Sequence, residues 1–264
     1  QDGRPCTVAS TVRQSTPLEE LNLNWREQDL RERDRTKHVH RLHPYLGKYI
    51  PQLVEIFLRK YFSAGETVLD PFSGSGTTLV QANELGINSI GYDVSEFNVL
   101  LAQAKTALYN IPKLKKEVND LLIRLESGQR SDLFNQASKT DAFNDEASEY
   151  LKTWFAPQAL AELFAFRRLI SEYDNQDLLR VILSRAARSA RLTTHFDLDF
   201  PKKPQTEPYF CYKHSRTCSP TSDAYKFIRR YAIDTVVRVE EFSTLRTKAK
   251  VQIHHADSRN GNFA

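Results

Sequence analysis

The sequence contains no methionine, only three cysteines and no long apolar segment among its 264 residues. Three cysteines are too few for a disulfide framework in a chain of this length, and they suit the reducing cytoplasm. No apolar run approaches the ~18 residues that a membrane-spanning helix needs, and the N-terminus lacks the apolar core of a signal peptide. We therefore expect a cytoplasmic protein with no membrane partner.

Neither sign of charge dominates the sequence. Lysine and arginine number 37 and aspartate and glutamate 33, which gives a net charge of +4. This mild excess permits a nucleic-acid partner without requiring one. Hydrophobic residues make up 40% of the chain, enough for a packed core in one large domain or in one domain with an insertion. The missing methionine, the start at Gln1 and the turn-like residues 260–262 predict a piece of a longer protein.

Hydrophobic periodicity divides the chain into four parts. They are a polar lead-in at 1–42 with a short helix near 18–33, a cofactor-binding α/β part at 43–112, a mostly helical insertion at 113–248, and a return strand at 249–264. The α/β part reads helix, strand, loop, helix, strand, helix, which is typical of a parallel sheet. We expect strands near 67–70, 89–92 and 250–254, with the second strand in the middle. The insertion is expected to hold helices near 113–127, 145–153, 157–172, 175–190 and 222–247, and a loop over 195–222.

A glycine-containing loop at residues 71–78 follows the first expected strand and leads into a helix. Such a loop lets backbone N–H groups approach a ligand closely. No lysine follows the glycines, so the loop is not a P-loop, and Leu79 stands where a dinucleotide fingerprint has its third glycine. Asp70 before the loop would repel a pyrophosphate but suits a cationic ligand such as S-adenosylmethionine. Asp93, 19 residues after Gly74, stands where an acid accepts ribose hydroxyls. The alternative is that both aspartates only cap helices.

At these residues the sequence resembles a known family. Residues 70–78 resemble motif I of the amino-group DNA methyltransferases, which modify cytosine N4 or adenine N6. Residues 43–51 look like the preceding motif X, 90–95 like motif II and 255–259 like motif III. Residues 154–157 and 185–191 are similar to the insertion of a cytosine-N4 subfamily. The resemblance implies an incomplete class I methyltransferase (Rossmann-like) sheet with a mostly helical insertion between its second and third strands.

The resemblance also implies roles for individual residues with S-adenosylmethionine as cofactor. His43 and Tyr45 would close over the methionine end. Asp93 would hold the ribose, and Val94 would pack on the adenine. Asp257 would accept the adenine amino group with Ser258 beside it. The methionine part would lie on Asp70, Pro71, Phe72, Ser73, Gly74, Ser75, Gly76 and Thr77.

The family's catalytic motif, Asp/Asn/Ser-Pro-Pro-Tyr/Phe, is not found in the sequence, and we expect it beyond residue 264. The string at 207–210 lacks the second proline and precedes motif III, so we do not assign it this role. An exocyclic amino nitrogen is a poor nucleophile, and the enzyme must flip the base out and accept its N–H bonds. This chain alone is therefore expected to be inactive. The whole protein is expected to methylate DNA in a restriction-modification system, with cytosine N4 favoured and possible pairing with a cognate restriction endonuclease. An RNA or tRNA base methyltransferase and a non-catalytic nucleic-acid-binding module are the alternatives.

Residues 180–230 carry eleven lysines and arginines against four acids. Aromatic residues at 209, 210 and 212 are interleaved with them. This composition favours a surface that contacts double-stranded DNA, although a solvated basic face is the alternative. The candidate contacts are Arg185, Arg188, Arg191, Lys202, Lys203, Lys213 and Arg216.

The same region contains a Cys-x2-His-x3-Cys pattern formed by Cys211, His214 and Cys218. Zinc could take these three residues with His195 as the fourth ligand. A structural zinc site usually shows two clean ligand pairs, and here there is one cluster. We therefore predict no metal and interpret the segment as a loop with incidental thiols.

Overall fold

The computed structural model describes residues 5–45, 47–129, 146–195 and 201–260. The chain divides into two units, unit 1 with residues 1–111 and 237–264 and unit 2 with residues 112–236. We expected the insertion at 113–248. The later boundary falls within helix α10 (Tyr225–Leu245), which continues from one unit into the other.

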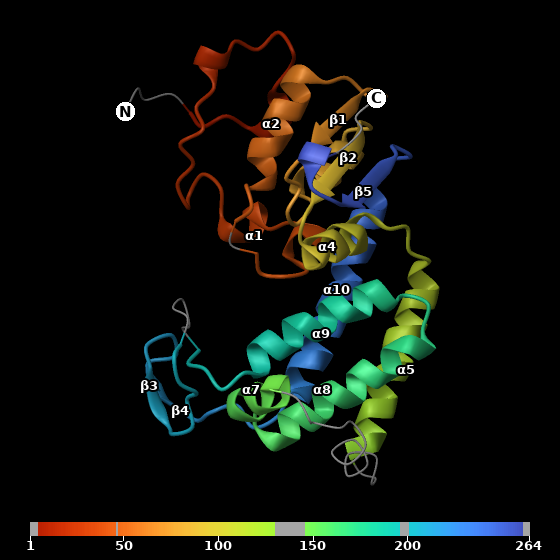
Figure 1. Ribbon diagram of the computed structural model, residues 1–264. Coiled ribbons are helices and arrows are strands. Elements are labelled where there is room, and N and C mark those ends of the chain that lie inside the picture. The colour runs from red at the N-terminus through yellow and green to blue at the C-terminus, as the bar shows by residue number, and fades with distance from the viewer. Residues whose placement is uncertain (1–4, 46, 130–145, 196–200, 261–264) are drawn as a thin grey trace. The chain divides into compact units, whose positions relative to one another are not determined.

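Unit 1 contains a three-stranded parallel sheet (Figure 1). Its strands are β1 (Thr67–Asp70), β2 (Asn88–Asp93) and β5 (Val251–His255), in the order β1-β2-β5. Leu69 of β1 pairs with Ile90 of β2, and Gly91 of β2 pairs with Ile253 of β5. The expected strands, their parallel direction and the central place of the second strand are confirmed, and so is the mixed α/β fold class.

Helices α2 (Pro51–Tyr61), α3 (Thr77–Glu84) and α4 (Glu96–Thr106) accompany the sheet. Pro51 occupies the first turn of α2, where its missing N–H costs nothing. The side chain of Ser95 accepts a hydrogen bond from the N–H of Asn98 and so caps α4, as the sequence predicts. Gly86 follows α3 with a φ of +74°, a conformation that favours glycine at a helix end.

From residue 5 to residue 41, the N-terminal segment of unit 1 contains only short helices, so the expected helix near 18–33 is wrong. The segment forms η1 (Ala9–Thr11), η2 (Leu18–Glu20), α1 (Glu32–Arg35) and η3 (His38–Arg41). Between η2 and α1 the backbone is bonded to other parts of the chain: Asn22 accepts from the N–H of Thr7, and its own N–H donates to the Thr7 hydroxyl. Leu21, Leu23 and Trp25 pack against a cluster formed by Ala9, Val12 and Ile56 of α2, and this packing replaces the helix that local periodicity favours.

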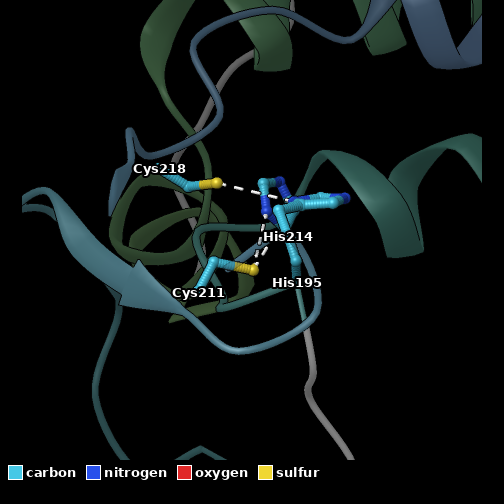
Figure 2. Close-up of side chains that lie close together, drawn as sticks. All are labelled: His195, Cys211, His214 and Cys218. Carbon is cyan, nitrogen blue, oxygen red and sulfur yellow. Dashed lines mark hydrogen bonds between the residues drawn. The ribbon is translucent and has the colours of Figure 1, made fainter. Parts of the chain in front are cut away.

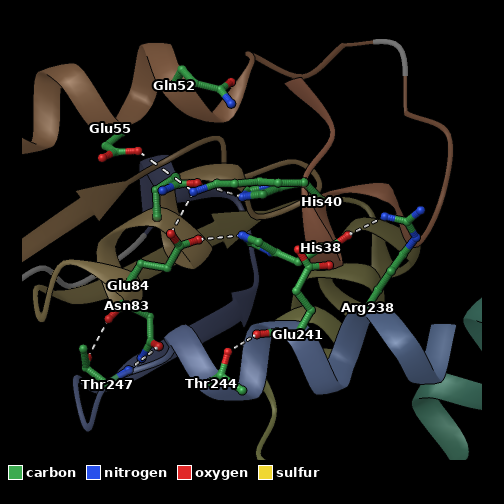
Figure 3. Close-up of polar contacts among 12 residues, drawn as sticks. His38, His40, Gln52, Glu55, Asn83, Glu84, Arg238, Glu241, Thr244 and Thr247 are labelled. Atoms are coloured by element: carbon green, nitrogen blue, oxygen red, sulfur yellow. Dashed lines mark hydrogen bonds and ion pairs between the residues drawn. The ribbon is translucent and has the colours of Figure 1, made fainter. Parts of the chain in front are cut away.

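Polar side chains join η3 to α3 in unit 1 (Figure 3). Glu84 lies 2.8 Å from both His38 Nε2 and Lys37 Nζ. Burial raises the pKa of Glu84, but the hydrogen bonds from His38 and Lys37 outweigh it and leave this pKa below its ordinary value. His40 Nε2 lies 3.0 Å from the Gln81 side-chain oxygen, and burial lowers the pKa of His40 well below its usual range. These contacts within unit 1 account for the burial of both histidines.

Unit 2 is mostly helical. Its described helices are α5 (Ile111–Gln129), α7 (Glu146–Trp154), α8 (Pro157–Leu169), η4 (Ile170–Glu172), α9 (Gln176–Ala190) and the first part of α10. The buried carboxylate of Glu162 in α8 accepts from the N–H groups of Ala224 and Tyr225, at 2.6 and 2.7 Å, where α10 begins. No helix among the described residues is long and apolar enough to cross a membrane.

The expected loop at 195–222 contains an antiparallel hairpin that the sequence did not predict. Its strands are β3 (Tyr209–Cys211) and β4 (Arg216–Cys218). Three-residue strands are too short for a two-residue periodicity to stand out, and the prolines around them indicate a loop. Residues 130–145, which include most of the polar gap between the expected helices, lie outside the described residues.

Candidate functional site

The loop between β1 and α3 has a backbone that depends on glycine. Gly74 has a φ of +49° and Gly76 a φ of +77°. A Cβ atom on Gly76 would lie 2.8 Å from the Cβ atom of Ala102 in α4. Glycine at this position therefore allows both the left-handed turn and the close approach of α4.

Asp93 at the end of β2 holds this loop. Its Oδ2 atom accepts from the N–H of Gly74 at 2.9 Å, and its Oδ1 atom accepts from Ser95 N at 2.9 Å and from Asn98 Nδ2 at 3.0 Å. A carboxylate has about four acceptor positions, so these three bonds leave one for a ligand. The structure therefore brings the two halves of the predicted cofactor site together, Gly74 and Asp93, although they are 19 residues apart.

Two residues of α4 that the sequence reasoning missed also support the loop. Asn98 donates to the Tyr45 hydroxyl at 3.3 Å as well as to Asp93. Lys105 is fully buried, and its Nζ atom donates to the Ser75 carbonyl at 2.6 Å. Burial, and then the charge of Lys48, lowers the pKa of Lys105 well below its ordinary value. A lysine on the apolar face of an expected helix was the signal that could have found it.

The segment predicted to close over the cofactor lies against the same loop. A Cβ atom on Gly74 would be 3.3 Å from the Tyr45 hydroxyl, so the Tyr45 ring covers this side of the glycine. His43 is buried, its ring meets Phe97 edge-on at 5.0 Å, and its Nδ1–H donates to the Pro44 carbonyl at 3.0 Å. Tyr45 is therefore the member of the pair that touches the loop.

The far end of β5 lies beside Asp93. The N–H of Ala256 donates to the Asp93 carbonyl at 3.1 Å, and His255 Nε2 lies 3.1 Å from the Val94 carbonyl. Asp257, predicted to bind the adenine amino group, accepts from the guanidinium and the N–H of Arg259, and these bonds lower the pKa of Asp257 to about 2. Ser258 next to it is buried. The Asp257 carboxylate therefore has a partner in this chain that a ligand would have to share or displace.

Several properties of the loop fit S-adenosylmethionine. The Asp70 carboxylate at the tip of β1 suits its sulfonium and ammonium charges, and no lysine or arginine stands in residues 68–78. Phe72 and Val94 are 81% and 70% exposed and offer apolar surface beside the polar loop. Among the described residues, the buried hydroxyl groups with no hydrogen-bond partner include Ser73, Ser75 and Thr77. Unpaired buried groups cost about 1–3 kcal/mol each, which a polar ligand or water could relieve.

The basic residues predicted to contact DNA differ in exposure. Arg185 is only 11% exposed, forms an ion pair with Asp234 at 2.6 Å and lies 4.1 Å from the centre of the Tyr231 ring. It therefore packs within unit 2, contrary to the expectation of a free DNA-facing charge. Arg191 lies over the Trp154 ring at 5.3 Å. The exposed members of the set are Arg188, Lys202, Lys203, Lys213 and Arg216.

The hairpin of unit 2 gathers four potential metal ligands. One ligand atom from each of His195, Cys211, His214 and Cys218 lies within 4.8 Å of the others (Figure 2). The sequence interpretation of this segment as a loop with incidental thiols does not account for this grouping. A second group, His38, His40 and Glu84, meets the same distance limit and is part of the polar contacts of unit 1.

A parallel sheet with a glycine loop at one strand tip and a carboxylate at the next defines a Rossmann-like cofactor-binding fold. Residues 12–104, which contain this arrangement, match the family model described as DNA methylase, of the N6 and N4 methyltransferases. This match and the similarity to a Type II methyltransferase confirm the resemblance of the chain to the amino-group DNA methyltransferases.

Individual relatives agree with the family match. The Type II methyltransferase M.MjaII of Methanocaldococcus jannaschii is 37% identical over 289 residues, covering 87% of this chain and 54% of that protein. M.MvaI of Kocuria varians is 24% identical, covering 58% of this chain and 34% of its own length. M.BsoBI of Geobacillus stearothermophilus is 29% identical, covering 44% of this chain and 23% of its own length. The chain thus spans about half the length of the first relative and less of the others. No solved structure shows a comparably significant match.

Proposed function

We propose that the protein containing this chain transfers a methyl group from S-adenosylmethionine to an exocyclic amino group in double-stranded DNA. The observation that carries the proposal is the hydrogen bond from the Gly74 N–H to Asp93 Oδ2, inside the segment that matches the DNA methylase family. This bond fixes a polar, glycine-dependent loop beside a carboxylate at the strand tips, where parallel α/β sheets bind their ligands.

The bound cofactor supplies an electrophilic methyl group on its sulfonium. In the proposal, Asp70 stabilises the cationic methionine part, and residues 71–77 surround it. Asp93 offers its remaining acceptor position to the ribose, and Val94 offers its exposed side chain to the adenine ring. Asp257 reaches the adenine amino group by sharing its carboxylate with Arg259.

We further propose cytosine N4 as the favoured target and a restriction-modification system as the setting. The similarity of residues 154–157 and 185–191 to a cytosine-N4 subfamily supports the base, and the relatives named as Type II methyltransferases support the setting. We assign no catalytic residue within this chain. The exposed basic residues of unit 2 are proposed phosphate contacts: Arg188, Lys202, Lys203, Lys213 and Arg216.

Calorimetry with S-adenosylmethionine on the full-length protein tests the cofactor site. Asp93→Ala should raise the Kd at least tenfold, because the variant loses a charge-assisted bond to the ribose worth about 1.5–3 kcal/mol. Asp34→Ala, which removes an exposed acid of the same unit, is the control and should leave the Kd unchanged. Circular dichroism establishes that both variants are folded. An unchanged Kd in folded Asp93→Ala would contradict the assignment of Asp93.

The substrate is tested by methyl transfer from labelled cofactor to DNA, followed by digestion to nucleosides and mass spectrometry. N4-methylcytosine is the expected product, and N6-methyladenine would correct the base but not the enzyme class. Labelling of RNA but not DNA would support the RNA methyltransferase alternative. Cofactor binding without methylation of either would support a non-catalytic nucleic-acid-binding module.

A further inference from the structure

The β3–β4 hairpin places two cysteines and a histidine close together. Tyr209 pairs with Cys218 and Cys211 pairs with Arg216, so the two cysteines lie near one another across the short ladder. Both cysteines are buried. His214 lies in the connecting turn, where its backbone N–H donates to the Cys211 carbonyl at 3.1 Å. The turn therefore directs a histidine back to the strand that carries the first cysteine.

The fourth group comes from a different part of unit 2. His195 follows α9, and its backbone N–H donates to the Tyr209 hydroxyl at 2.8 Å. Its ring centre lies 4.8 Å from that of His214, with the two rings nearly perpendicular at 71°. The hairpin and the segment after α9 thus meet at these side chains (Figure 2).

The distances within this cluster match those between ligands of one tetrahedral zinc ion. Zinc–sulfur and zinc–nitrogen bonds of about 2.3 and 2.0–2.1 Å at a tetrahedral angle place sulfur and nitrogen about 3.5 Å apart. His214 Nδ1 lies 3.5 Å from Cys211 Sγ and 3.5 Å from Cys218 Sγ. His195 Nδ1 lies 3.7 Å from Cys211 Sγ.

Thiol–imidazole hydrogen bonds alone explain these contacts less well. His214 Nδ1 faces two sulfur atoms at the same distance, and a ring nitrogen has either one proton or one lone pair to share. One of the two contacts would then lack a full hydrogen bond. A cation at the centre would accept electron pairs from both sulfurs and both nitrogens at once.

We propose that His195, Cys211, His214 and Cys218 form a structural zinc site. Two thiolates and two neutral imidazoles suit Zn²⁺ and neutralise its charge, and four protein ligands leave no open position for catalysis. The ion ties the hairpin to the chain after α9 and fixes the exposed tip that carries Tyr212, Lys213 and Arg216. The site is independent of the cofactor site and does not rest on the proposed function.

Metal analysis of the untagged full-length protein tests this site without cofactor or DNA. The wild type should contain one zinc equivalent more than Cys211→Ser and Cys218→Ser. Cys6→Ser changes the chain's third cysteine, which is outside the cluster, and should retain the full zinc content. Retention of zinc in both cluster variants, or equal loss in Cys6→Ser, would overturn the proposal.

Cobalt substitution keeps the test decisive if the serine variants fail to fold. The wild type, stripped of metal and supplied with Co²⁺ alone, should show the intense visible absorption of a tetrahedral site and a thiolate-to-cobalt charge-transfer band. Added Zn²⁺ should abolish both signals at one equivalent. Absence of the thiolate band, or a disulfide between Cys211 and Cys218 in protein purified under reducing conditions, would refute the zinc site.

Discussion

Replacement of Gly76 by alanine should destabilise unit 1 by two separable effects. The first is backbone strain, because a φ of +77° costs an L-residue about 1–2 kcal/mol. The second is a steric clash, since the new methyl group would lie 2.8 Å from Ala102 Cβ and 3.2 Å from Ala102 Cα. Overpacking of this kind costs about 1–3 kcal/mol. We therefore expect the free energy of unfolding to fall by about 2–5 kcal/mol.

Gly65→Ala is the matched control for this prediction. Gly65 has a φ of +92°, and a Cβ atom there meets nothing within 4 Å, so this variant should show only the backbone cost. Urea unfolding of both variants separates the two effects. Adding Ala102→Gly to Gly76→Ala should recover part of the clash, with a coupling energy of about 1–3 kcal/mol. If Gly76→Ala is no more destabilising than Gly65→Ala, the close approach of α4 to the loop is refuted.

Three further changes probe groups that hold the loop and unit 2. Asp93→Asn places either an amide N–H₂ or an uncharged, weaker acceptor opposite the Gly74 N–H, so the free energy of unfolding should fall by about 1.5–3 kcal/mol in urea titrations. A loss below about 0.5 kcal/mol would contradict the role of the Asp93 charge in holding the loop. Burial lowers the pKa of Lys105 well below 10.5, so unfolding takes up a proton and wild-type stability should rise with pH toward 10.5. Lys105→Met should remove that rise, and an equal dependence of stability on pH in the two proteins would argue against a neutral buried Lys105. Glu162→Gln removes the charge that caps α10 and should cost about 1–2 kcal/mol, measured by thermal unfolding, whereas an unchanged Tm would show that the charge is dispensable.

Local patterns were sufficient to predict the sheet of unit 1. Apolar runs ending in an acid located β1 and β2, and the same format located β5. The glycine loop and the spacing from Gly74 to Asp93 also predicted which two residues meet, because the carboxyl ends of neighbouring parallel strands lie at one edge.

Features that depend on distant partners were not predictable in this way. Arg185 has the same local sequence pattern as an exposed arginine, but its partner Asp234 is 49 residues away and buries it. The sequence offered His195 as a fourth ligand, but it is 16 residues from Cys211 across a segment rich in proline, so spacing alone did not show that the two side chains meet. For the same reason the segment near residue 22 does not form the expected helix: it hydrogen-bonds to Thr7 and packs against the cluster that includes Ile56 of α2.

The central position of β2 has a consequence for how unit 1 assembles. One neighbour of β2, strand β1, lies close to it in the sequence. The other neighbour, β5, is distant: the N–H of Lys250, just before β5, donates to Asn88 Oδ1 in β2 across 162 residues. Closing a flexible loop of that length costs about 4–5 kcal/mol of chain entropy, and helices that form early in the intervening segment shorten it. Such distant contacts slow folding, so β5 should dock last. Until then the open side of β2, with Gly91 and its exposed backbone groups, is available to chaperones and to other chains.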